Sequence, residues 1–490
     1  MQMLSQLLHD ITVISSTGNT DIPVSGLAID SRLVSEGSLF IAIRGTVADG
    51  HDFIGSVIEK GTTSIVCETL PAAMYEGVTY IQVADTKESL GHLSSAFYNH
   101  PSSKIKLVGV TGTNGKTTVA TLLFQLFRNF GYRCGLLSTV QNCIQDEVIP
   151  ATHTTPDAIS LNALLARMTD AGCEYVFMEC SSHAIHQRRI AALHFTAALF
   201  TNLTHDHLDY HKTFAAYRDA KKLFFDTLSD DAIAIINKDD KNGPVMIQNT
   251  KASCYTYSMS AVSDFKVRIL EHDLNGMLLS LDGTEVWVQL TGEFNAYNLC
   301  LVYATAFLLG ISKEELPAAI SLLRPVTGRF DYLRSEQGIT AIVDYAHTPD
   351  ALKNVLTTIE KIRTRNEQLI TVIGCGGDRD KAKRPVMASV ACELSDKVIF
   401  TSDNPRTENP ETILDEMEKG VRADQYKKTM RITDRRQAIK TAVQIARPGD
   451  ILLIAGKGHE TYQEVNGIKT HFDDKEEVLA CFEMMKNNTH

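Results

Sequence analysis

Apolar residues recur along this chain in short runs that end in polar, often glycine-rich loops. In the first hundred residues, the runs 38–43 and 63–66 are typical of strands. The run 105–110 is followed by a glycine-rich loop and then by apolar positions at helical spacing: Val119, Leu122, Leu123, Leu126, Phe127 and Phe130. Gly131 is the expected end of this helix. The succession of strand, loop and helix predicts an α/β fold.

Further buried strands are expected at 175–180, 197–201 and 232–237, which favours a doubly wound central sheet. The segments 99–103 and 324–328 are rich in turn-forming residues. A chain of 490 residues is long enough for about three domains. We therefore predict domains at 1–100, 101–327 and 328–490.

In the last third of the chain, four apolar runs are each closed by a polar loop. The runs are 341–343, 369–373, 397–401 and 451–454, and the loops read DYAHTP, GCGGDRDK, SDNPR and AGKGHE. A parallel sheet would bring all four loops to its carboxyl edge, where ligands bind in open α/β sheets. Strand–helix connections are polar in any case, but that does not explain why Asp, His, Arg and Glu stand beside glycine here.

Composition narrows the possible functions. The net charge of -11 argues against a nucleic-acid partner. The ten cysteines form no C-x-x-C pair, and the N-terminus lacks the basic and apolar regions of a signal peptide. The longest apolar stretch, 299–309, is too short to span a bilayer. We expect a cytoplasmic protein that does not insert into membranes.

The segment GVTGTNGKTT is similar to a phosphate-binding P-loop. Its spacing is not the strict one, because Val110 stands where the first glycine is expected. The alternative, a glycine-rich turn that opens a helix, would not need a lysine followed by two threonines. We predict that this loop binds the phosphates of ATP through Gly112, Thr113, Asn114, Gly115, Lys116, Thr117 and Thr118.

Two features indicate a metal. Glu179 ends a buried run, where a carboxylate is costly without a metal or another partner, so we expect it to bind Mg²⁺ with Thr117. A helix cap or salt bridge is the alternative. The segment 204–211 holds three histidines and two aspartates but lacks H-E-x-x-H spacing and a nearby cysteine. We expect one residue of this segment to reach a metal.

Seven motifs, in order, resemble those of the Mur ligases, cytoplasmic enzymes that add amino acids to the peptidoglycan precursor. They are GTNGKTT, MECSSH (178–183), NLTHDHLDYH (202–211), YRDAK (217–221), GEFNAYN (292–298), GRFD (328–331) and DYAHTPD (344–350). With further segments, the resemblance runs from about residue 25 to about residue 465. It implies an N-terminal domain for a UDP-linked substrate, a central P-loop-type ATPase and a Rossmann-like C-terminal domain for the amino acid.

The resemblance also implies roles for single residues. Thr117 and Glu179 would bind one Mg²⁺, and His207, Glu179 and Lys221 a second, with Lys221 carbamylated. Free lysine is a cation and cannot bind a metal, whereas a carbamate is an anion. Lys116, Lys221, His207 and Glu179 are the expected catalytic residues. The remaining ATP contacts would come from Asn295, Asn298, Arg329 and Asp344, and His347 would help to position phosphate or nucleophile.

Other motifs resemble the member of the family that extends a UDP-N-acetylmuramoyl dipeptide. The segments 29–32 and 45–50 are similar to its uridine-binding part. The expected substrate contacts are Ile29, Ser31, Thr46, His153, Thr154, Thr155, Ser181, Gln187 and Arg189. His153 stands where we expect Asn, which puts one hydrogen bond in doubt.

The tetrapeptide Asp403, Asn404, Pro405, Arg406 resembles the signature of the type that adds meso-diaminopimelate. Arg406 would hold the distal carboxylate, which lysine lacks, through two parallel N–H bonds. Arg379, Gly456 and Glu460 match the other acceptor-binding positions. An isolated DNPR would more often be a proline turn with an Asp cap. We expect ATP-dependent addition of meso-diaminopimelate to the D-glutamyl residue, through an acyl phosphate, by a monomeric enzyme.

Two alternatives remain. A lysine-adding or folylpolyglutamate-type ligase would share the architecture, but DNPR and the Asp30-Ser31-Arg32 segment argue against both. A nucleotide-binding module without ligase activity would be expected to lack some metal-binding or acceptor residues, and all of these are present.

Overall fold

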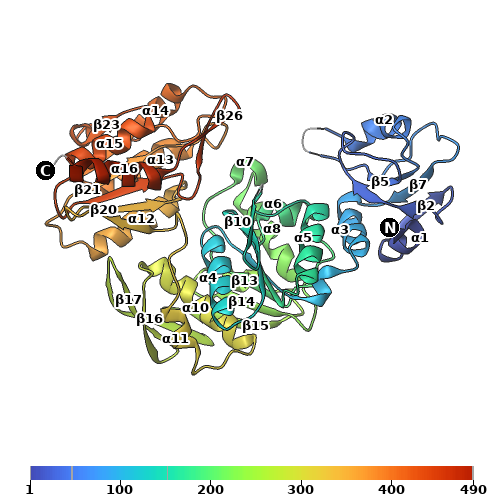
Figure 1. Ribbon diagram of the computed structural model, residues 1–490, viewed down its shortest axis with the longest axis horizontal. Coiled ribbons are helices and arrows are strands. Elements are labelled where there is room, and N and C mark those ends of the chain that lie inside the picture. Colours follow the sequence, from blue (N-terminus) through green and yellow to red (C-terminus); the bar gives the residue numbers. More distant parts are fainter. Residues whose placement is uncertain (1, 46–47, 152, 488–490) are drawn as a thin grey trace.

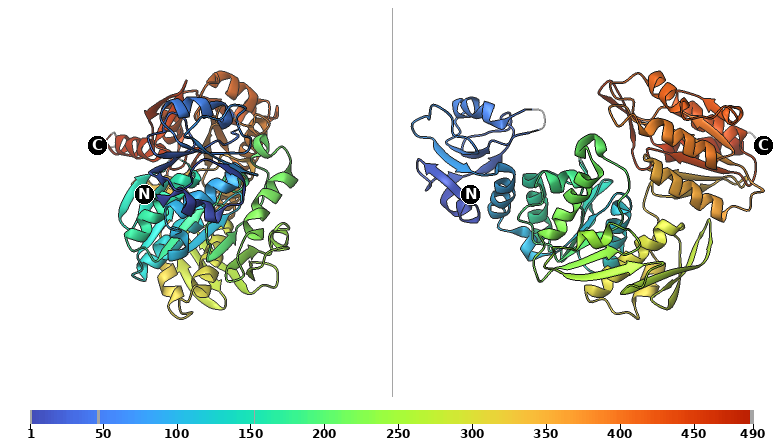
Figure 2. Two further views of the ribbon diagram at one scale, coloured as in Figure 1. Left: turned by 90° about the vertical axis from the view of Figure 1, so that its right-hand side faces the viewer. Right: turned by 180° about the vertical axis from the view of Figure 1, so that it is seen from behind.

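The computed structural model describes residues 2–45, 48–151 and 153–487. Within these ranges the chain forms three α/β domains, each built on its own sheet, with the central domain between the other two (Figure 1). Seen from behind, the three domains lie along an arc (Figure 2). In the part of the chain described, no helix is long and apolar enough to cross a membrane. The predicted three-domain α/β fold is confirmed.

The N-terminal sheet has the strand order β2-β7-β6-β5-β4, with β4 to β7 parallel and β2 antiparallel. The two predicted strands are present as β5 and β6, and both are buried along their length, as expected of inner parallel strands. The elements are β2 (Val13–Thr17), β4 (Gly26–Ala28), β5 (Ser38–Ile41), β6 (Ser64–Cys67), β7 (Thr79–Val83), α1 (Leu4–Leu7), α2 (Ile54–Glu59) and α3 (Thr86–Phe97), besides a β1 (Gln2–Met3) to β3 (Pro23–Val24) pair.

The central sheet has the order β11-β10-β9-β12-β8-β13-β14-β15-β16-β17-β18 among the described residues. Strands β9, β12, β8, β13, β14, β15 and β16 pair in parallel, whereas β10–β11 and β17–β18 extend the two edges antiparallel. Alternate residues of β8 face opposite layers: Val108 and Val110 pack with α4 and α10, and Leu107 packs with α5 and α8. The predicted doubly wound arrangement is therefore present.

The strands of this domain are β8 (Lys106–Thr111), β9 (Cys134–Leu137), β10 (Gln141–Ile144), β11 (Glu147–Pro150), β12 (Tyr175–Glu179), β13 (Ala197–Phe200), β14 (Ile233–Asn237), β15 (Ser253–Ser258), β16 (Phe265–Asp273), β17 (Gly276–Leu281) and β18 (Thr284–Val288). Its helices are α4 (Lys116–Asn129), α5 (Ala158–Asp170), α6 (Ser182–His186), α7 (Leu208–His211), α8 (Phe214–Asp226), α9 (Gly243–Met246), α10 (Glu293–Leu308) and α11 (Leu316–Ser321).

The C-terminal sheet has the order β19-β20-β24-β21-β22-β23, and β20, β24, β21 and β22 are parallel. The carboxyl ends of the four predicted strands therefore lie at one edge, as the sequence indicated. Helices α12 to α14 cover one face and α15 and α16 the other. The elements are β19 (Asp331–Arg334), β20 (Thr340–Asp344), β21 (Leu369–Ile373), β22 (Lys397–Phe400), β23 (Thr429–Arg431), β24 (Ile451–Ala455), β25 (Tyr462–Val465), β26 (Ile468–His471), α12 (Pro349–Ile362), α13 (Lys383–Leu394), α14 (Pro410–Glu418), α15 (Arg435–Ile445) and α16 (Asp474–Asn487).

Candidate active site

The glycine-rich loop joins β8 to α4 and leaves no space for side chains at two of its positions. Gly112 has φ +147°, and a Cβ there would lie 1.9 Å from Thr201 Oγ1. Gly115 has φ +87°, and a Cβ there would lie 2.6 Å from Asn298 Oδ1. Both positions therefore require glycine. The loop ends at the N-terminus of α4, where backbone N–H groups favour an anion.

The half-buried Lys116 and the buried Lys221 converge on this loop. Lys116 Nζ donates to the carbonyls of Gly112 at 3.0 Å and Thr113 at 2.8 Å. Lys221 Nζ, from α8, donates to the same Gly112 carbonyl at 2.8 Å. Burial lowers the pKa of both amines, and the charge of Lys116 lowers the pKa of Lys221 further. An anion reaching this point would meet two amines at once.

A buried carboxylate and hydroxyl form a polar centre beside the loop. Thr117 Oγ1 donates to Glu179 Oε1 at 2.9 Å, and the Thr139 amide donates to the same oxygen at 2.6 Å. Arg329 Nη2 donates to Thr117 Oγ1 at 3.2 Å. These hard oxygen atoms fit Mg²⁺. Among the described residues, no group of three or more His, Cys, Asp and Glu side chains is arranged to hold a metal, so a Mg²⁺ site here would also need other ligands.

His207 comes directly before α7 and has a left-handed backbone, with φ 53°. Burial lowers the pKa of His207 to about 3, although the carboxylate of Asp206, 3.4 Å from Nε2, opposes this. The imidazole is therefore neutral at physiological pH, which is the form that binds metals. Asp206 and His207 both line the same cavity as Glu179.

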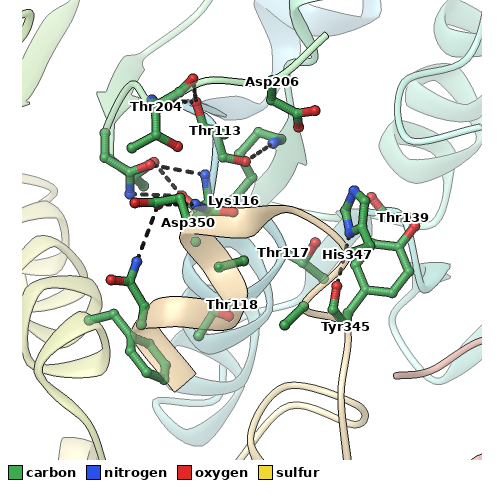
Figure 3. A pocket seen from close by; sticks show the side chains of 18 of the residues that line it. Thr113, Lys116, Thr117, Thr118, Thr139, Thr204, Asp206, Tyr345, His347 and Asp350 are labelled. Atoms are coloured by element: carbon green, nitrogen blue, oxygen red, sulfur yellow. Dashed lines mark hydrogen bonds between the residues drawn. The ribbon is translucent and has the colours of Figure 1, made fainter. Parts of the chain in front are cut away.

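The C-terminal domain contacts the loop through the start of α12 (Figure 3). Asn114 Nδ2 donates to Asp350 Oδ2 at 3.2 Å. His347 Nδ1 lies 2.9 Å from the carbonyl of Tyr345, and Lys383 Nζ donates to the His347 carbonyl at 3.0 Å. Burial, followed by the charge of Lys383, lowers the pKa of His347 to about 4. The C-terminal domain therefore lies against the glycine-rich loop, here called the phosphate loop.

Three loops that are predicted to bind the amino-acid acceptor, here called the acceptor loops, lie at the carboxyl edge of the C-terminal sheet: 374–381, 402–406 and 455–460. Asn404 Nδ2 donates to Glu460 Oε2 at 2.7 Å, and Arg406 Nη1 donates to the Gly377 carbonyl at 2.7 Å. Arg406 has a left-handed backbone, with φ 51°. Burial, followed by the charge of Asp403, raises the pKa of Glu460.

The loop 153–155, which is predicted to contact the UDP-linked substrate, lies against the end of β12. Thr154 Oγ1 accepts from Thr139 Oγ1 at 3.0 Å, and Thr155 Oγ1 donates to the Glu179 carbonyl at 2.8 Å. Arg189 Nη1 donates to the Thr155 carbonyl at 2.9 Å, and Gln187 Oε1 accepts from Arg189 Nε at 3.0 Å. Gln187 therefore orients Arg189 and does not itself line the cavity.

One cavity of about 910 Å³ joins these parts. Its described lining includes most of the predicted site residues: Thr113, Asn114, Gly115, Lys116, Thr117, Thr118, His153, Thr154, Thr155, Glu179, Ser181, Arg189, His207, Lys221, Asn298, Arg329, Asp344, Arg379, Asp403, Asn404, Arg406, Gly456 and Glu460.

Some predicted residues lie elsewhere. Ile29 and Ser31 belong to the N-terminal domain, which contributes no described residue to the cavity wall, and Thr46 lies outside the described residues. Gly112, Pro405 and Asn295 are not among the lining residues. Asn295 Oδ1 accepts from Nδ2 of the lining residue Asn298 at 3.1 Å.

The sequence did not single out several lining residues. Thr139 follows the buried strand β9, and Asp350 is at the start of α12, so a polar residue at the end of a strand or the start of a helix was the available signal. Lys383 begins α13, and nothing in its spacing marked it.

Models of known protein families match a segment in each of the three domains. The model of the Mur ligase middle domain matches residues 110–306, that of the Mur ligase glutamate ligase domain 328–458, and that of the Mur ligase family catalytic domain 23–98. The chain belongs to the Mur ligase family. A Mur ligase of Cytophaga hutchinsonii named UDP-N-acetylmuramoyl-L-alanyl-D-glutamate–2,6-diaminopimelate ligase is 58% identical over 96% of this chain and 97% of its own.

Other members of the Mur ligase family also match nearly the whole chain. A protein of the same name from Bacteroides fragilis is 55% identical over 98% of this chain and 99% of its own. A solved structure of a UDP-N-acetylmuramoyl-L-alanyl-D-glutamate–2,6-diaminopimelate ligase is 33% identical with a TM-score of 0.70, and the match covers 99% of this chain and 100% of that one.

Proposed function

We propose that this chain adds meso-2,6-diaminopimelate to the D-glutamyl residue of UDP-N-acetylmuramoyl-L-alanyl-D-glutamate, with conversion of ATP to ADP and phosphate. The observation that carries the proposal is that one cavity is lined by residues of the phosphate loop and by Asp403, Asn404, Arg406 and Glu460. Relatives named for this reaction match nearly the whole chain at 58% and 55% identity.

The phosphate loop would hold ATP. Gly112 and Gly115 let the backbone approach the phosphates, and Lys116 supplies a cation beside them. Arg329 adds a second cation, 3.2 Å from Thr117 Oγ1. Asn298 and Asp344 line the cavity as further ATP contacts, with Asn295 supporting Asn298.

Thr117 and Glu179 have the oxygen atoms to hold one Mg²⁺, and His207, Glu179 and Lys221 would hold a second. Bound Mg²⁺ offsets the negative charge of the phosphates. Lys221 would bind the metal only as its carbamate, because a protonated amine has no lone pair to donate to a metal. Its burial beside Gly112 and Lys116 gives an anionic carbamate a neighbouring cation.

The reaction proceeds in two steps. An oxygen of the D-glutamyl γ-carboxylate attacks the γ-phosphorus of ATP, and the bond from phosphorus to the ADP oxygen breaks. The resulting acyl phosphate is attacked at its carbonyl carbon by the diaminopimelate amine, which loses a proton. The carbon–oxygen bond then breaks and phosphate leaves. Positioning and charge stabilisation by Lys116 and Arg329 carry most of the catalysis.

The acceptor loops would select the amino acid. Arg406 pairs with the distal carboxylate of diaminopimelate, and Glu460 accepts from its ammonium group. Arg379, Asp403, Asn404 and Gly456 complete this part of the wall. Sites built to pair a polar group can reject an analogue that lacks it by about 10⁴–10⁵. L-Lysine has no distal carboxylate to pair with Arg406.

The UDP-linked substrate would extend from the N-terminal domain, at Ile29, Ser31 and Thr46, to the loop 153–155 and to Ser181, Gln187 and Arg189. We assign this domain to 1–100, the ATPase to 101–327 and the acceptor domain to 328–490; the family matches at 23–98, 110–306 and 328–458 lie within these ranges. We place the enzyme in the cytoplasm as a monomer.

Phosphate release by the purified full-length chain tests the function. With ATP and the UDP-linked dipeptide present, release should begin only when diaminopimelate is added, and omission of any one component should stop it. Release with L-lysine at the rate seen with diaminopimelate would favour the lysine-adding alternative. Release with glutamate and a folate would favour the folylpolyglutamate type.

A further inference from the structure

The AGKGHE loop contains a buried lysine that does not line the cavity. Lys457 lies between Gly456 and Gly458 in the loop after β24, and its side chain is 0% exposed. A buried ammonium is costly unless it is paired. Lys457 Nζ lies 3.2 Å from Asn404 Oδ1 and 3.2 Å from Glu460 Oε2. Both partners are predicted acceptor-binding residues.

These three side chains form a closed set of hydrogen bonds. Asn404 Nδ2 donates to Glu460 Oε2 at 2.7 Å, while Asn404 Oδ1 accepts from the Glu464 amide at 2.9 Å as well as from Lys457. The amide of Asn404 therefore has only one orientation that satisfies its partners. Two donors, Lys457 and Asn404, occupy Glu460 Oε2.

The second oxygen of Glu460 is left for the cavity. Oε1 has the Tyr345 hydroxyl at 3.5 Å, a long contact, and Glu460 lines the cavity. Burial and the neighbouring Asp403 both raise the pKa of Glu460, whereas Lys457 lowers it. Lys457 is thus the nearest cation that keeps this carboxylate ionised.

We propose that Lys457 is a positioning residue for the amino-acid acceptor: it fixes one oxygen of Glu460 and presents the other, as a carboxylate, to the acceptor's ammonium group. The proposal rests on the proposed ligase function and deepens it. Lys457 does not touch the substrate. Its loss should therefore weaken acceptor binding and leave the ATP side of the reaction intact.

The test uses Lys457→Met in the full-length enzyme, with initial rates at varied diaminopimelate and varied ATP. We expect KM for diaminopimelate to rise about 10- to 100-fold, as for loss of a charged hydrogen bond, with kcat changed less than about threefold. KM for ATP should not change. The acidic limb of kcat/KM for diaminopimelate should move to higher pH, because Glu460 loses the cation that lowers its pKa.

Lys469→Met is the matched control. Lys469 Nζ lies 4.2 Å from the centre of the Tyr462 ring and Lys457 Nζ 5.4 Å from it, but Lys469 is exposed and contacts neither Glu460 nor Asn404 among the described interactions. Its KM for diaminopimelate should equal that of the wild type.

A double-mutant cycle separates positioning from a general role in the fold. In a Glu460→Gln background, Lys457→Met should change KM for diaminopimelate by less than about threefold, because Lys457 acts through Glu460. Equal effects of Lys457→Met in both backgrounds would overturn the proposal. Lys457→Gln serves as a second neutral variant, and if neither neutral variant folds, Lys457 supports the fold and the proposal is wrong.

The proposed function and the role of Lys457 can be contradicted separately. A wild-type enzyme that releases no phosphate with diaminopimelate contradicts the proposed function. If the wild type releases phosphate with diaminopimelate, and Lys457→Met has the same KM for diaminopimelate and the same pH profile, only the role of Lys457 is contradicted.

Discussion

A fully buried ion pair ties the last helix of the chain to the acceptor loops. Arg435 donates from Nε and Nη2 to the two carboxylate oxygens of Asp474, both at 2.7 Å, and both side chains are 0% exposed. Arg435 also donates to the carbonyls of Ser402 at 3.4 Å and Ala455 at 3.0 Å. Those carbonyls directly precede Asp403 and Gly456, so this guanidinium holds two of the acceptor loops, 402–406 and 455–460, at their base.

Asp474→Asn removes the negative charge and keeps the shape. Breaking a buried pair by neutralising one partner costs about 3–5 kcal/mol, because the other charge stays buried and unpaired. For a domain of this size, 1 kcal/mol corresponds to about 2–4 °C, so the unfolding transition of the C-terminal domain should fall by about 6–20 °C. KM for diaminopimelate should rise as well, since the base of these two acceptor loops is loosened.

Calorimetry of the full-length protein measures the transition, and Glu477→Gln provides the control. Glu477 pairs with Arg436 at 2.7 Å between the same two helices, but Arg436 is 59% exposed, so its loss should cost less than about 1 kcal/mol. If Asp474→Asn destabilises the protein no more than Glu477→Gln does, the reasoning about the buried pair is wrong.

Three further predictions concern the cavity. Lys221→Ala should abolish phosphate release, and added bicarbonate should not restore it. The control Lys222→Ala, which breaks a 2.6 Å pair with Asp226, should remain active. Full activity of Lys221→Ala would refute the carbamate role. Arg406→Leu should lower kcat/KM for diaminopimelate at least about 100-fold without changing KM for ATP, and an equal loss for both substrates would argue against carboxylate recognition. Burial raises the pKa of Asp344 from 3.8 to about 6, so its stabilising contribution is present below pH 3.8 and is lost as the pH rises through about 6. In denaturant unfolding, the free energy of unfolding of the wild type should fall by up to about 3 kcal/mol relative to that of Asp344→Asn between about pH 4 and pH 7. A pH-independent difference between the two proteins would contradict the raised pKa of Asp344.

Much of the fold is readable from periodicity because the parallel strands are buried on both faces. The run 105–110 and the helical spacing from Val119 to Phe130 correspond to β8 and α4. The β25–β26 hairpin is largely exposed and gave no comparable signal. For β17 and β18 a signal was available, because buried positions alternate on both sides of the Asp282-Gly283 turn, but it was not used.

The site was partly readable because strand-end loops carry its residues. Lys221 shows the limit: without the family resemblance it is interpreted as a surface lysine of a helix, yet it is 1% exposed. Tyr217, Ala220 and Phe224 of α8 are buried, and helical spacing puts Lys221 on the same face. That spacing was the available signal. Lys457 gave no such signal, because a loop between two glycines has no periodicity from which burial could be inferred.

Product analysis with competing acceptors decides whether the enzyme adds diaminopimelate. The full-length enzyme is given ATP, the UDP-linked dipeptide and equal concentrations of meso-diaminopimelate and L-lysine, and the products are identified by mass spectrometry. We expect the diaminopimelate product to predominate by orders of magnitude, because only that acceptor offers Arg406 a distal carboxylate. A mixture in which the lysine product equals or exceeds the diaminopimelate product would contradict it.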